Sequence, residues 1–349
     1  MRRMLVTGGA GFIGSNFVRH WLRDHPDDRV LVLDALTYAG KRRSLASVEH
    51  LSNFRFIHGN ICDSALVAGL LRDEAIDTMV HFAAESHVDR SITGPAAFIE
   101  TNVVGTHSLL EAARRVWLEE RRGTKHRFHH VSTDEVYGSL GPEDPPFRED
   151  TQYAPNSPYS ASKAAADHLV RAYHHTYGLQ VTTSNCSNNY GPYHFPEKLI
   201  PLTIVNILHG KPLPVYGDGR NIRDWLHVSD HCRAIELILE KGRIGEVYNI
   251  GGRAEAENLQ LVRTLCEIAE RLCAQRPDIA SRYPQCPRRE AASLIRMVAD
   301  RPGHDRRYAI DCAKIQRELG FEPSVNLHAG LTETFAWFAD NSDWWRADA

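Results

Sequence analysis

Short apolar runs alternate with amphipathic stretches through the first half of the chain. This alternation is expected of βαβ units that assemble into a parallel sheet. The runs predict strands at residues 4–7, 30–34, 54–59, 78–82 and 127–132, and the amphipathic stretches predict helices at 14–23, 64–73 and 98–115. The pattern therefore predicts a doubly wound α/β fold.

A polar, proline-containing segment follows these units. Residues 142–158 are rich in Pro, Asp and Glu and are typical of a surface loop. Ser157 followed by Pro158 is typical of a helix N-terminus, because serine caps the first turn and proline suits the first helical position. We expect a helix to begin there and to end near Gly178.

The regular alternation breaks down beyond Tyr190, where prolines recur. Stretches at 230–241 and 247–251 still predict a helix and a strand, which we expect to return to the main sheet. The second half is therefore expected to form a smaller, mixed unit. The domains expected are residues 1–190, with return segments near 226–251, and a discontinuous C-terminal domain over residues 191–349.

The composition is that of an ordinary globular protein, with 42% hydrophobic and 24% charged residues. The formal charge of −3 offers no broad basic surface for nucleic acid or an anionic membrane. No apolar run approaches the roughly 20 residues that span a bilayer, and the apolar start at Met4 is broken at once by Thr7. We expect no nucleic-acid partner, no membrane association and no secretory signal.

Seven cysteines are scattered along the chain, and none has Cys-x-x-Cys spacing. Their odd number and irregular spacing indicate neither a disulfide framework nor a zinc site. The reducing cytoplasm is therefore the expected compartment. The histidines, including His129, His130, His174 and His175, show no ligand spacing, so they are interpreted as surface or packing residues and no metal is expected.

A glycine-rich segment directly follows the first expected strand. Residues 7–14 read Thr-Gly-Gly-Ala-Gly-Phe-Ile-Gly and satisfy the G-x-G-x-x-G spacing. Without side chains, the backbone can approach a pyrophosphate, which then lies on the amide groups of the helix N-terminus. The segment therefore predicts a dinucleotide site in a Rossmann-type domain.

Asp34 ends the second expected strand, twenty residues after Gly14. A carboxylate at this point accepts hydrogen bonds from the ribose hydroxyls and repels a 2′-phosphate. This favours NAD over NADP. Lys41, Arg42 and Arg43 lie close enough in the sequence to keep NADP open.

Tyr159 and Lys163 are four residues apart at the start of the capped helix, so both project from one helical face. A phenol has an ordinary pKa of about 10, and a nearby ammonium favours the phenolate. The pair is therefore a candidate for proton transfer beside a bound dinucleotide. The lysine is also placed to hold the nicotinamide ribose.

Several longer motifs occur in order along nearly the whole chain. They are TGGAGFIGS at 7–15, DALTYAG at 34–40, AAESHVDR at 83–90, TDEVYG at 133–138, YSASK at 159–163, NCSNNYGP at 185–192 and DRPGH at 300–304. On these motifs the chain resembles the extended, nucleotide-sugar branch of the short-chain dehydrogenase/reductase superfamily. Within that branch it is most similar to the 4,6-dehydratases that act on dTDP-glucose.

The resemblance implies an NAD-dependent hydro-lyase of deoxysugar biosynthesis, which converts dTDP-glucose to dTDP-4-keto-6-deoxyglucose and water. Eliminating water across C5 and C6 needs a base for the C5 proton and an acid for the departing hydroxyl. By resemblance, Glu135 is the base, Asp134 is the acid and Thr133 contacts the sugar near O4. Resemblance also implies a homodimer, formed through the helices near 98–115 and 158–177.

The resemblance also implies two sets of contact residues. The cofactor set comprises Gly8, Gly11, Phe12, Ile13, Gly14, Asp34, Ala35, Leu36, Thr37, Asn60, Ile61, Phe82, Ala83, Ala84, Ser86, Thr101, Tyr159, Lys163 and Asn189. The substrate set comprises Ser86, Thr133, Asn188, Lys198, Leu199, Pro214, Val215, Tyr216, Arg223, Asn258, Asp300, Arg301, Pro302, Gly303 and His304. Two positions depart from the family pattern, since Phe82 replaces the usual leucine and Asn60 a frequent aspartate.

Three alternatives remain open at this point. A nucleotide-sugar 4-epimerase would need the hydride relay but not the carboxyl pair, so Glu135 argues against it. A related dehydratase could use another nucleotide sugar, because the preference for thymidine rests on resemblance alone. A dinucleotide-binding regulator without turnover is disfavoured, because Thr133, Asp134, Glu135, Tyr159 and Lys163 are all present.

Overall fold

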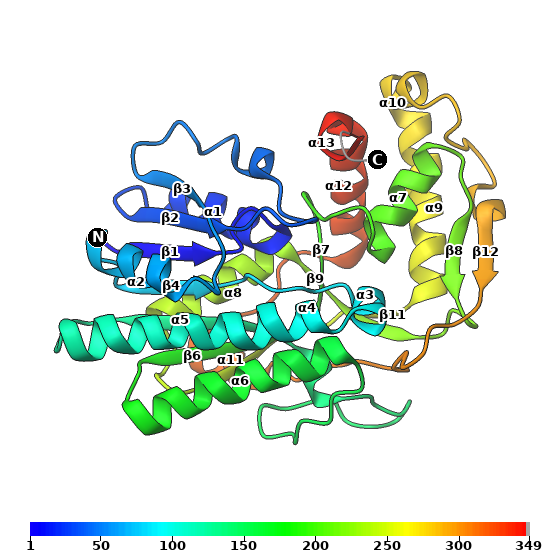
Figure 1. Cartoon of the computed structure of the whole chain (residues 1–349). Coiled ribbons are helices and arrows are strands. Elements are labelled where there is room, and N and C mark those ends of the chain that lie inside the picture. Colours follow the sequence, from blue (N-terminus) through cyan, green and yellow to red (C-terminus); the bar gives the residue numbers. More distant parts are fainter. Residues whose placement is uncertain (347–349) are drawn as a thin grey trace.

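The computed structural model describes residues 1–346 of the chain and is built around a seven-stranded sheet (Figure 1). All neighbouring strands in it run parallel, in the order β10-β6-β5-β4-β1-β2-β3. The strands are β1 (Arg3–Thr7), β2 (Arg29–Asp34), β3 (Phe54–His58), β4 (Thr78–His81), β5 (Arg127–Thr133), β6 (Val181–Cys186) and β10 (Val247–Ile250). The order reverses at β1, which opens a crevice at the carboxyl ends of the strands. The expected Rossmann-type α/β fold is confirmed.

Helices cover both faces of this sheet and bury a separate apolar core on each. One face carries α1 (Phe12–Asp24) and α8 (Val228–Lys241), which pack against each other. The other carries α2 (Ser64–Asp73), α5 (Thr106–Ala113) and α6 (Pro158–Tyr177). None of the described helices is long and apolar enough to cross a membrane.

The start and end of α6 agree with the sequence prediction. Ser157 caps the helix, because its hydroxyl accepts the backbone N–H of Ser160 at 3.0 Å while the Ser160 hydroxyl accepts the N–H of Ser157. Gly178 ends it with a φ of 78°, a left-handed conformation that costs glycine little. This capping fixes where the first turn of α6, with Tyr159, begins.

The helix expected over residues 98–115 is longer and less regular than predicted. Helical structure begins with α4 (Ala96–Phe98), continues through α5 and ends at residue 120, and the stretches Ile99–Gly105 and Arg114–Glu120 are π-helical. Asn102 in the first of these stretches is buried, and its side-chain amide bonds the backbone of Glu85. Such a tertiary contact cannot be recognised from the periodicity of the sequence.

The rest of the chain builds a smaller, mixed unit with its own apolar core. It contains a three-stranded sheet ordered β11-β9-β7 and a parallel pair β12-β8. Its strands are β7 (Asn188–Tyr190), β8 (Leu213–Tyr216), β9 (Ile222–His227), β11 (Glu255–Glu257) and β12 (Ile295–Val298). The remaining helices are α3 (Val88–Thr93), α7 (Leu199–Leu208), α9 (Asn258–Gln275), α10 (Pro277–Arg282), α11 (Ala313–Leu319), α12 (Leu327–Asp340) and α13 (Ser342–Arg346).

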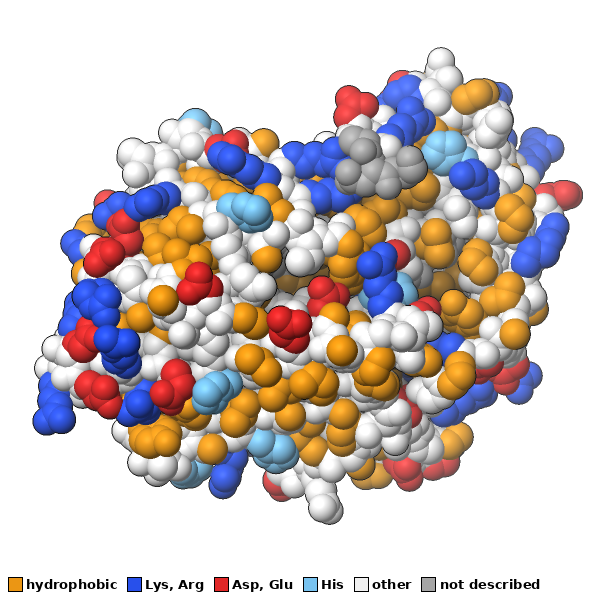
Figure 2. All heavy atoms as spheres, viewed as in Figure 1, with side chains coloured by type: hydrophobic (Ala, Val, Ile, Leu, Met, Phe, Trp, Pro, Cys, Tyr) orange, Lys and Arg blue, Asp and Glu red, His pale blue; other side chains and the backbone are white. Residues whose placement is uncertain are grey.

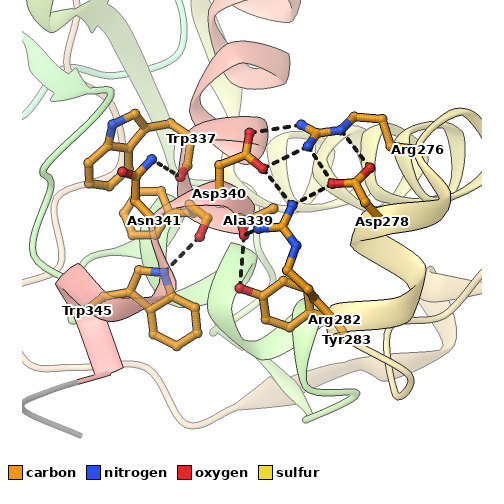
Figure 3. Close-up of polar contacts among 10 residues, drawn as sticks. Arg276, Asp278, Arg282, Tyr283, Trp337, Ala339, Asp340, Asn341 and Trp345 are labelled. Atoms are coloured by element: carbon orange, nitrogen blue, oxygen red, sulfur yellow. Dashed lines mark hydrogen bonds and ion pairs between the residues drawn. The ribbon is translucent and has the colours of Figure 1, made fainter.

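The end of α12 is tied to the α9–α10 corner by polar contacts (Figure 3). Arg276 and Arg282 both donate to the carboxylate of Asp340, at 2.8 and 2.7 Å. The Tyr283 hydroxyl donates to the backbone carbonyl of Ala339 at 3.1 Å. The ion pairs are about a third exposed and contribute little, whereas the bond of Tyr283 is buried. These contacts fix the helix ends, and the apolar core beneath them supplies most of the stability.

Candidate functional site

A cavity of about 480 Å³ lies where the carboxyl ends of the parallel strands meet the smaller unit. Residues from both halves of the chain line it. The lining includes the cofactor set apart from Leu36, and the substrate set apart from Asp300, Pro302 and Gly303. Leu36 instead donates its backbone N–H to Asp34, and Asp300 accepts a bond from His304.

The glycine loop between β1 and α1 is packed too tightly for side chains. A Cβ on Gly14 would lie 2.3 Å from the carbonyl oxygen of Gly8, and a Cβ on Gly8 would lie 2.5 Å from the backbone nitrogen of Ala83. Gly8 also has a φ of 69°. The loop therefore brings backbone amides to the cavity at the start of α1, where an anion is stabilised.

Asp34 lies at the end of β2 beside this loop, and its carboxylate is largely buried. It accepts the backbone N–H groups of Ala10 and Leu36, both at 2.8 Å. Burial raises the pKa of Asp34, and the two backbone bonds oppose that rise. Asp34 also lines the cavity, so its remaining lone pairs can accept hydrogen bonds from a ligand that carries hydroxyl groups.

The three cations that kept NADP open have other contacts. Arg42 pairs with Glu49 at 2.7 Å, and the Lys41 ammonium lies 4.7 Å from the ring centre of Trp344. Arg43 donates to a backbone carbonyl in α13. All three side chains thus make their contacts away from the Asp34 carboxylate. This supports the preference for NAD, whose ribose carries no 2′-phosphate.

Thr133, Asp134 and Glu135 lie where β5 ends in a single 3₁₀ turn. The Thr133 hydroxyl caps that turn by accepting the backbone N–H of Glu135 at 3.2 Å. Asp134 is only 1% exposed, and no described residue bonds its Oδ2. Burial, and then the negative charge of Glu135, hold the pKa of Asp134 well above its ordinary value. Asp134 is therefore placed to keep a proton.

Glu135 lies in a more cationic environment than its neighbour. Burial raises its pKa as well, but the positive charges of Lys198, Arg223 and Arg301 work against that rise. Two adjacent carboxyl groups thus differ in how strongly each holds its proton. Such a difference is what separates an acid from a base at one site.

Tyr159 and Lys163 both line the cavity, but the expected effect of Lys163 on the tyrosine is not seen. Burial raises the pKa of Tyr159 well above its ordinary value, and the charge of Glu135 adds to the rise. Lys163 donates to the backbone carbonyl of Val131 at 2.9 Å. The prediction of a lowered phenol pKa is therefore wrong for the protein alone, because burial and nearby negative charge outweigh the hydrogen bond with Thr133.

At the other end of the cavity, two arginines are held by polar contacts. Arg223 donates to the backbone carbonyl of Asp305 at 3.0 Å, and Arg301 pairs with Asp89 at 2.8 Å. The Nε of Arg301 is buried and has no hydrogen-bond partner among the described residues. Tyr216 is 41% exposed at the rim and can stack on a planar group.

Several polar side chains line the cavity that the sequence reasoning did not name. Glu197 lies next to Lys198 and faces His87, with 3.7 Å between carboxylate and imidazole. Burial lowers the pKa of His87 to about 4. Burial also raises the pKa of Tyr38, whose hydroxyl bonds Glu197. His87 and Tyr38 lie inside quoted motifs, but Glu197 lies outside them, so no pattern pointed to it.

The comparisons with known proteins agree with this geometry. The sequence profile of the family described as GDP-mannose 4,6 dehydratase matches residues 5–334. The dTDP-glucose 4,6-dehydratase of Xanthomonas campestris pv. campestris (strain B100) is 57% identical over 346 residues, which cover 99% of this chain and 95% of that protein. The enzyme of the same name from Escherichia coli is 53% identical over 355 residues, with the same coverage.

Among solved structures, a dTDP-glucose 4,6-dehydratase from Streptomyces venezuelae, solved with NAD and TYD bound, superposes with a TM-score of 0.88. It is 49% identical, and the match covers 99% of this chain and all of the other. These likenesses extend over nearly the whole chain. The chain belongs to the dTDP-glucose 4,6-dehydratase family.

Proposed function

We propose that this protein is an NAD-dependent dTDP-glucose 4,6-dehydratase, a hydro-lyase that forms dTDP-4-keto-6-deoxyglucose and water. The observation that carries the proposal is the Asp134–Glu135 pair, which opens into the same cavity as Tyr159 and the glycine loop. The related enzymes of that name support the choice of substrate. A place in deoxysugar biosynthesis follows from the product.

The residues present fit NAD. The backbone amides after Gly11 would hold the pyrophosphate. Asp34 would bind the adenine ribose, and Lys163 would bind the nicotinamide ribose. Side chains at Gly8 or Gly14 would fill the space that the pyrophosphate needs. The related Streptomyces structure contains NAD. When bound, NAD⁺ accepts a hydride from C4 of the hexose and returns it to C6, so no cofactor is consumed.

The protein's own residues move the protons. Tyr159 takes the proton from O4 as C4 becomes a ketone, and the ketone acidifies the neighbouring C5 hydrogen. Glu135 removes that proton, Asp134 protonates the departing C6 oxygen, and a proton is returned to C5 when the hydride reaches C6. The raised pKa of Asp134 supports its role as the acid, and the three cations near Glu135 support the role of the base. Thr133, whose hydroxyl bonds Tyr159, orients O4.

We assign the nucleotide end of the substrate to the smaller unit of the fold. Arg223 and Arg301 present planar guanidinium groups that match phosphate oxygens, and Tyr216 lies at the rim where a base can stack. Residues 1–190, with the return segments near 226–251, would then form the NAD-binding domain. The rest of residues 191–349 would form the discontinuous substrate-binding domain.

The direct test is to incubate the purified protein, without added NAD⁺, with dTDP-glucose or UDP-glucose and to follow the alkali-induced absorbance of the 4-keto product. Product from dTDP-glucose alone supports the dehydratase, its retained cofactor and its thymidine preference. Product from UDP-glucose would indicate another nucleotide preference. No product from either, even with NAD⁺ supplied, would refute the proposal and favour an epimerase or a regulator.

Replacing Gly14 with alanine should remove the retained cofactor. The new Cβ would lie 2.3 Å from the Gly8 carbonyl, so the backbone of the loop must move. A shift of about 1 Å costs about 10²-fold in turnover. Cofactor released by heat from the purified variant measures the loss. Gly69→Ala in α2 is the matched control, because its Cβ would make only an ordinary contact at 4.0 Å with the Asp73 side chain, and full activity is expected.

The elimination step should depend on pH through both carboxyl groups. Glu135 acts as the base only when ionised, so the rate falls as pH drops through its raised pKa. Asp134 acts as the acid only when protonated, so the rate falls as pH rises through its raised pKa. A 6-fluoro substrate analogue loses fluoride without protonation. The elimination rate of this analogue should still fall at low pH but should no longer fall at high pH. An unchanged fall at high pH would contradict the role of Asp134.

We also propose that the protein is a cytoplasmic homodimer. Exposed apolar side chains gather over α4, the π-helical stretch that follows it and α6 (Figure 2), and they include Ile99 and Val104 at 50% and 49% exposure. A second copy can cover this face with the same helices. The cysteines are all free thiols, as in a reducing compartment.

Replacing Val104 with arginine should dissociate the dimer. An unpaired charge buried at an interface costs a few kcal/mol, which corresponds to about 10²-fold or more in the dissociation constant. Sedimentation velocity at several protein concentrations measures it. Ile244→Arg places the same charge on an exposed residue outside this face and should leave the dimer intact. A monomeric parent protein would rule out the proposal.

A further inference from the structure

Helices α1 and α8 carry a cluster of imidazole and carboxylate groups where they pack together, on the face of the sheet away from α5 and α6. Each helix presents two possible ligands four residues apart, which places them on one helical face. On α1 these are His20 and Asp24, and on α8 they are Glu236 and Glu240. His25 follows directly after α1.

Glu236 is the centre of the cluster. One of its carboxylate oxygens lies 2.7 Å from Nε2 of His20, and the other lies 2.5 Å from Nε2 of His25. Its side chain is only 16% exposed. A mostly buried carboxylate held between two imidazoles is therefore fixed in position, and Arg23 is close enough to add a favourable charge interaction.

The two imidazoles are not equivalent. Arg23 donates to Nδ1 of His20 at 2.9 Å, which fixes the proton of neutral His20 on Nε2 and directs it to Glu236. His20 therefore holds Glu236 but cannot offer a free Nε2 lone pair. Nε2 of His25 donates to Glu236 in the same way, but no donor among the described residues bonds its Nδ1. The proton of His25 can therefore move to Nδ1 when a metal ion binds, which frees Nε2 as a ligand.

His25 is also held in place. Its ring stacks on the buried Trp21, with 4.1 Å between ring centres and 22° between planes. Ligand atoms of His25, Glu236 and Glu240 all lie within 4.8 Å of one another, a span that one metal ion can bridge. Asp24 is less suited as a ligand, because Arg23 occupies both of its oxygens at 2.7 and 2.8 Å.

We propose that His25, Glu236 and Glu240 bind a divalent first-row transition-metal ion, with His20 orienting Glu236 from outside the ligand set. One imidazole and two carboxylates suit Zn²⁺ better than Mg²⁺ or Ca²⁺, which prefer oxygen ligands alone. The sequence analysis expected no metal, because some two hundred residues separate His25 from Glu236 and no short motif joins them. The bound ion would link the end of α1 to α8.

The site is separate from the proposed dehydratase chemistry. The glycine loop precedes α1, whereas His25 follows its last residue, and a helix of 13 residues is about 20 Å long. Loss of the metal should therefore leave turnover of dTDP-glucose unchanged. The ion is expected to raise the melting temperature, since it binds the folded chain and not the separated helices.

The test is Zn²⁺ titration of the full chain in competition with a chromogenic chelator. One ion per chain is expected, with binding lost in His25→Gln and Glu236→Gln and weakened about 10–100-fold in His20→Gln, as for an outer-shell partner. His50→Gln, which changes an exposed histidine elsewhere, should bind normally. Dehydratase activity of each variant shows that it is folded.

Co²⁺ then identifies the ligand atoms. Nitrogen and oxygen ligands give weak visible bands, and these should disappear in His25→Gln. Three results would each overturn the proposal. They are an intense near-ultraviolet thiolate band, a Zn²⁺ affinity that is unchanged in His25→Gln and Glu236→Gln, and the absence of saturable binding.

Discussion

Replacing Glu135 with glutamine is expected to lower kcat by about 10²–10⁴-fold, the usual worth of a general base. The amide keeps the shape of the side chain but cannot accept the C5 proton. Oxidation at C4 needs Tyr159 and not Glu135, so reduced cofactor should still form. Substrate recovered from deuterated water should carry no deuterium at C5, as measured by mass spectrometry.

Replacing Asp134 with asparagine distinguishes the roles of the two carboxyl groups. Asparagine cannot protonate the leaving oxygen, so product formation should fall by a similar factor of about 10²–10⁴. Glu135 is still present, so exchange at C5 should continue. Glu143→Gln on the exposed loop after β5 is the control and should retain full activity. If C5 exchange survived in Glu135→Gln and disappeared in Asp134→Asn, the two roles would have to be reversed.

Local signals explain why much of the larger unit was predictable. The glycine loop is recognisable because close packing forbids side chains there, and the ends of α6 are recognisable because Ser157 and Gly178 act through their own backbone neighbours. These features depend on a few adjacent residues. They also position the pyrophosphate site and Tyr159, so the same signals that predict the fold predict the core of the site.

Strand β6 escaped prediction because most of its buried residues are polar. Thr182 and Ser184 are fully buried, and each bonds a ring nitrogen of His129 on the neighbouring strand, at 3.0 and 3.2 Å. The interpretation of His129 as a packing residue is confirmed by these bonds. A strand whose polar groups find their partners across the sheet cannot be recognised from hydrophobic periodicity.

The substrate end of the cavity could be predicted only through resemblance. Arg223 comes from β9, Tyr216 from β8 and Arg301 from a loop, and only the tertiary fold brings them together. Glu197 and His87 meet in the same way. The raised pKa of Tyr159 could not be predicted from the sequence either, because it depends on how completely the cavity buries the phenol.

Replacing Tyr159 with phenylalanine is expected to lower the rate of C4 oxidation by about 10²–10⁴-fold, because no group remains to take the O4 proton. Every later step depends on the C4 ketone, so overall turnover should fall by the same factor. Single-turnover absorbance of the reduced nicotinamide measures the oxidation directly. Tyr177→Phe, the same change at an exposed position of α6, should leave the rate unchanged.

The raised pKa of Tyr159 gives this prediction a second, independent signature. The phenolate is the active base, so the parent oxidation rate should rise with pH until Tyr159 ionises. Tyr159→Phe should abolish that rise. A variant that kept the same pH dependence at a lower rate would show that another group accepts the proton. Tyr159 would then serve only to orient O4, and the buried phenol would have to be assigned to binding.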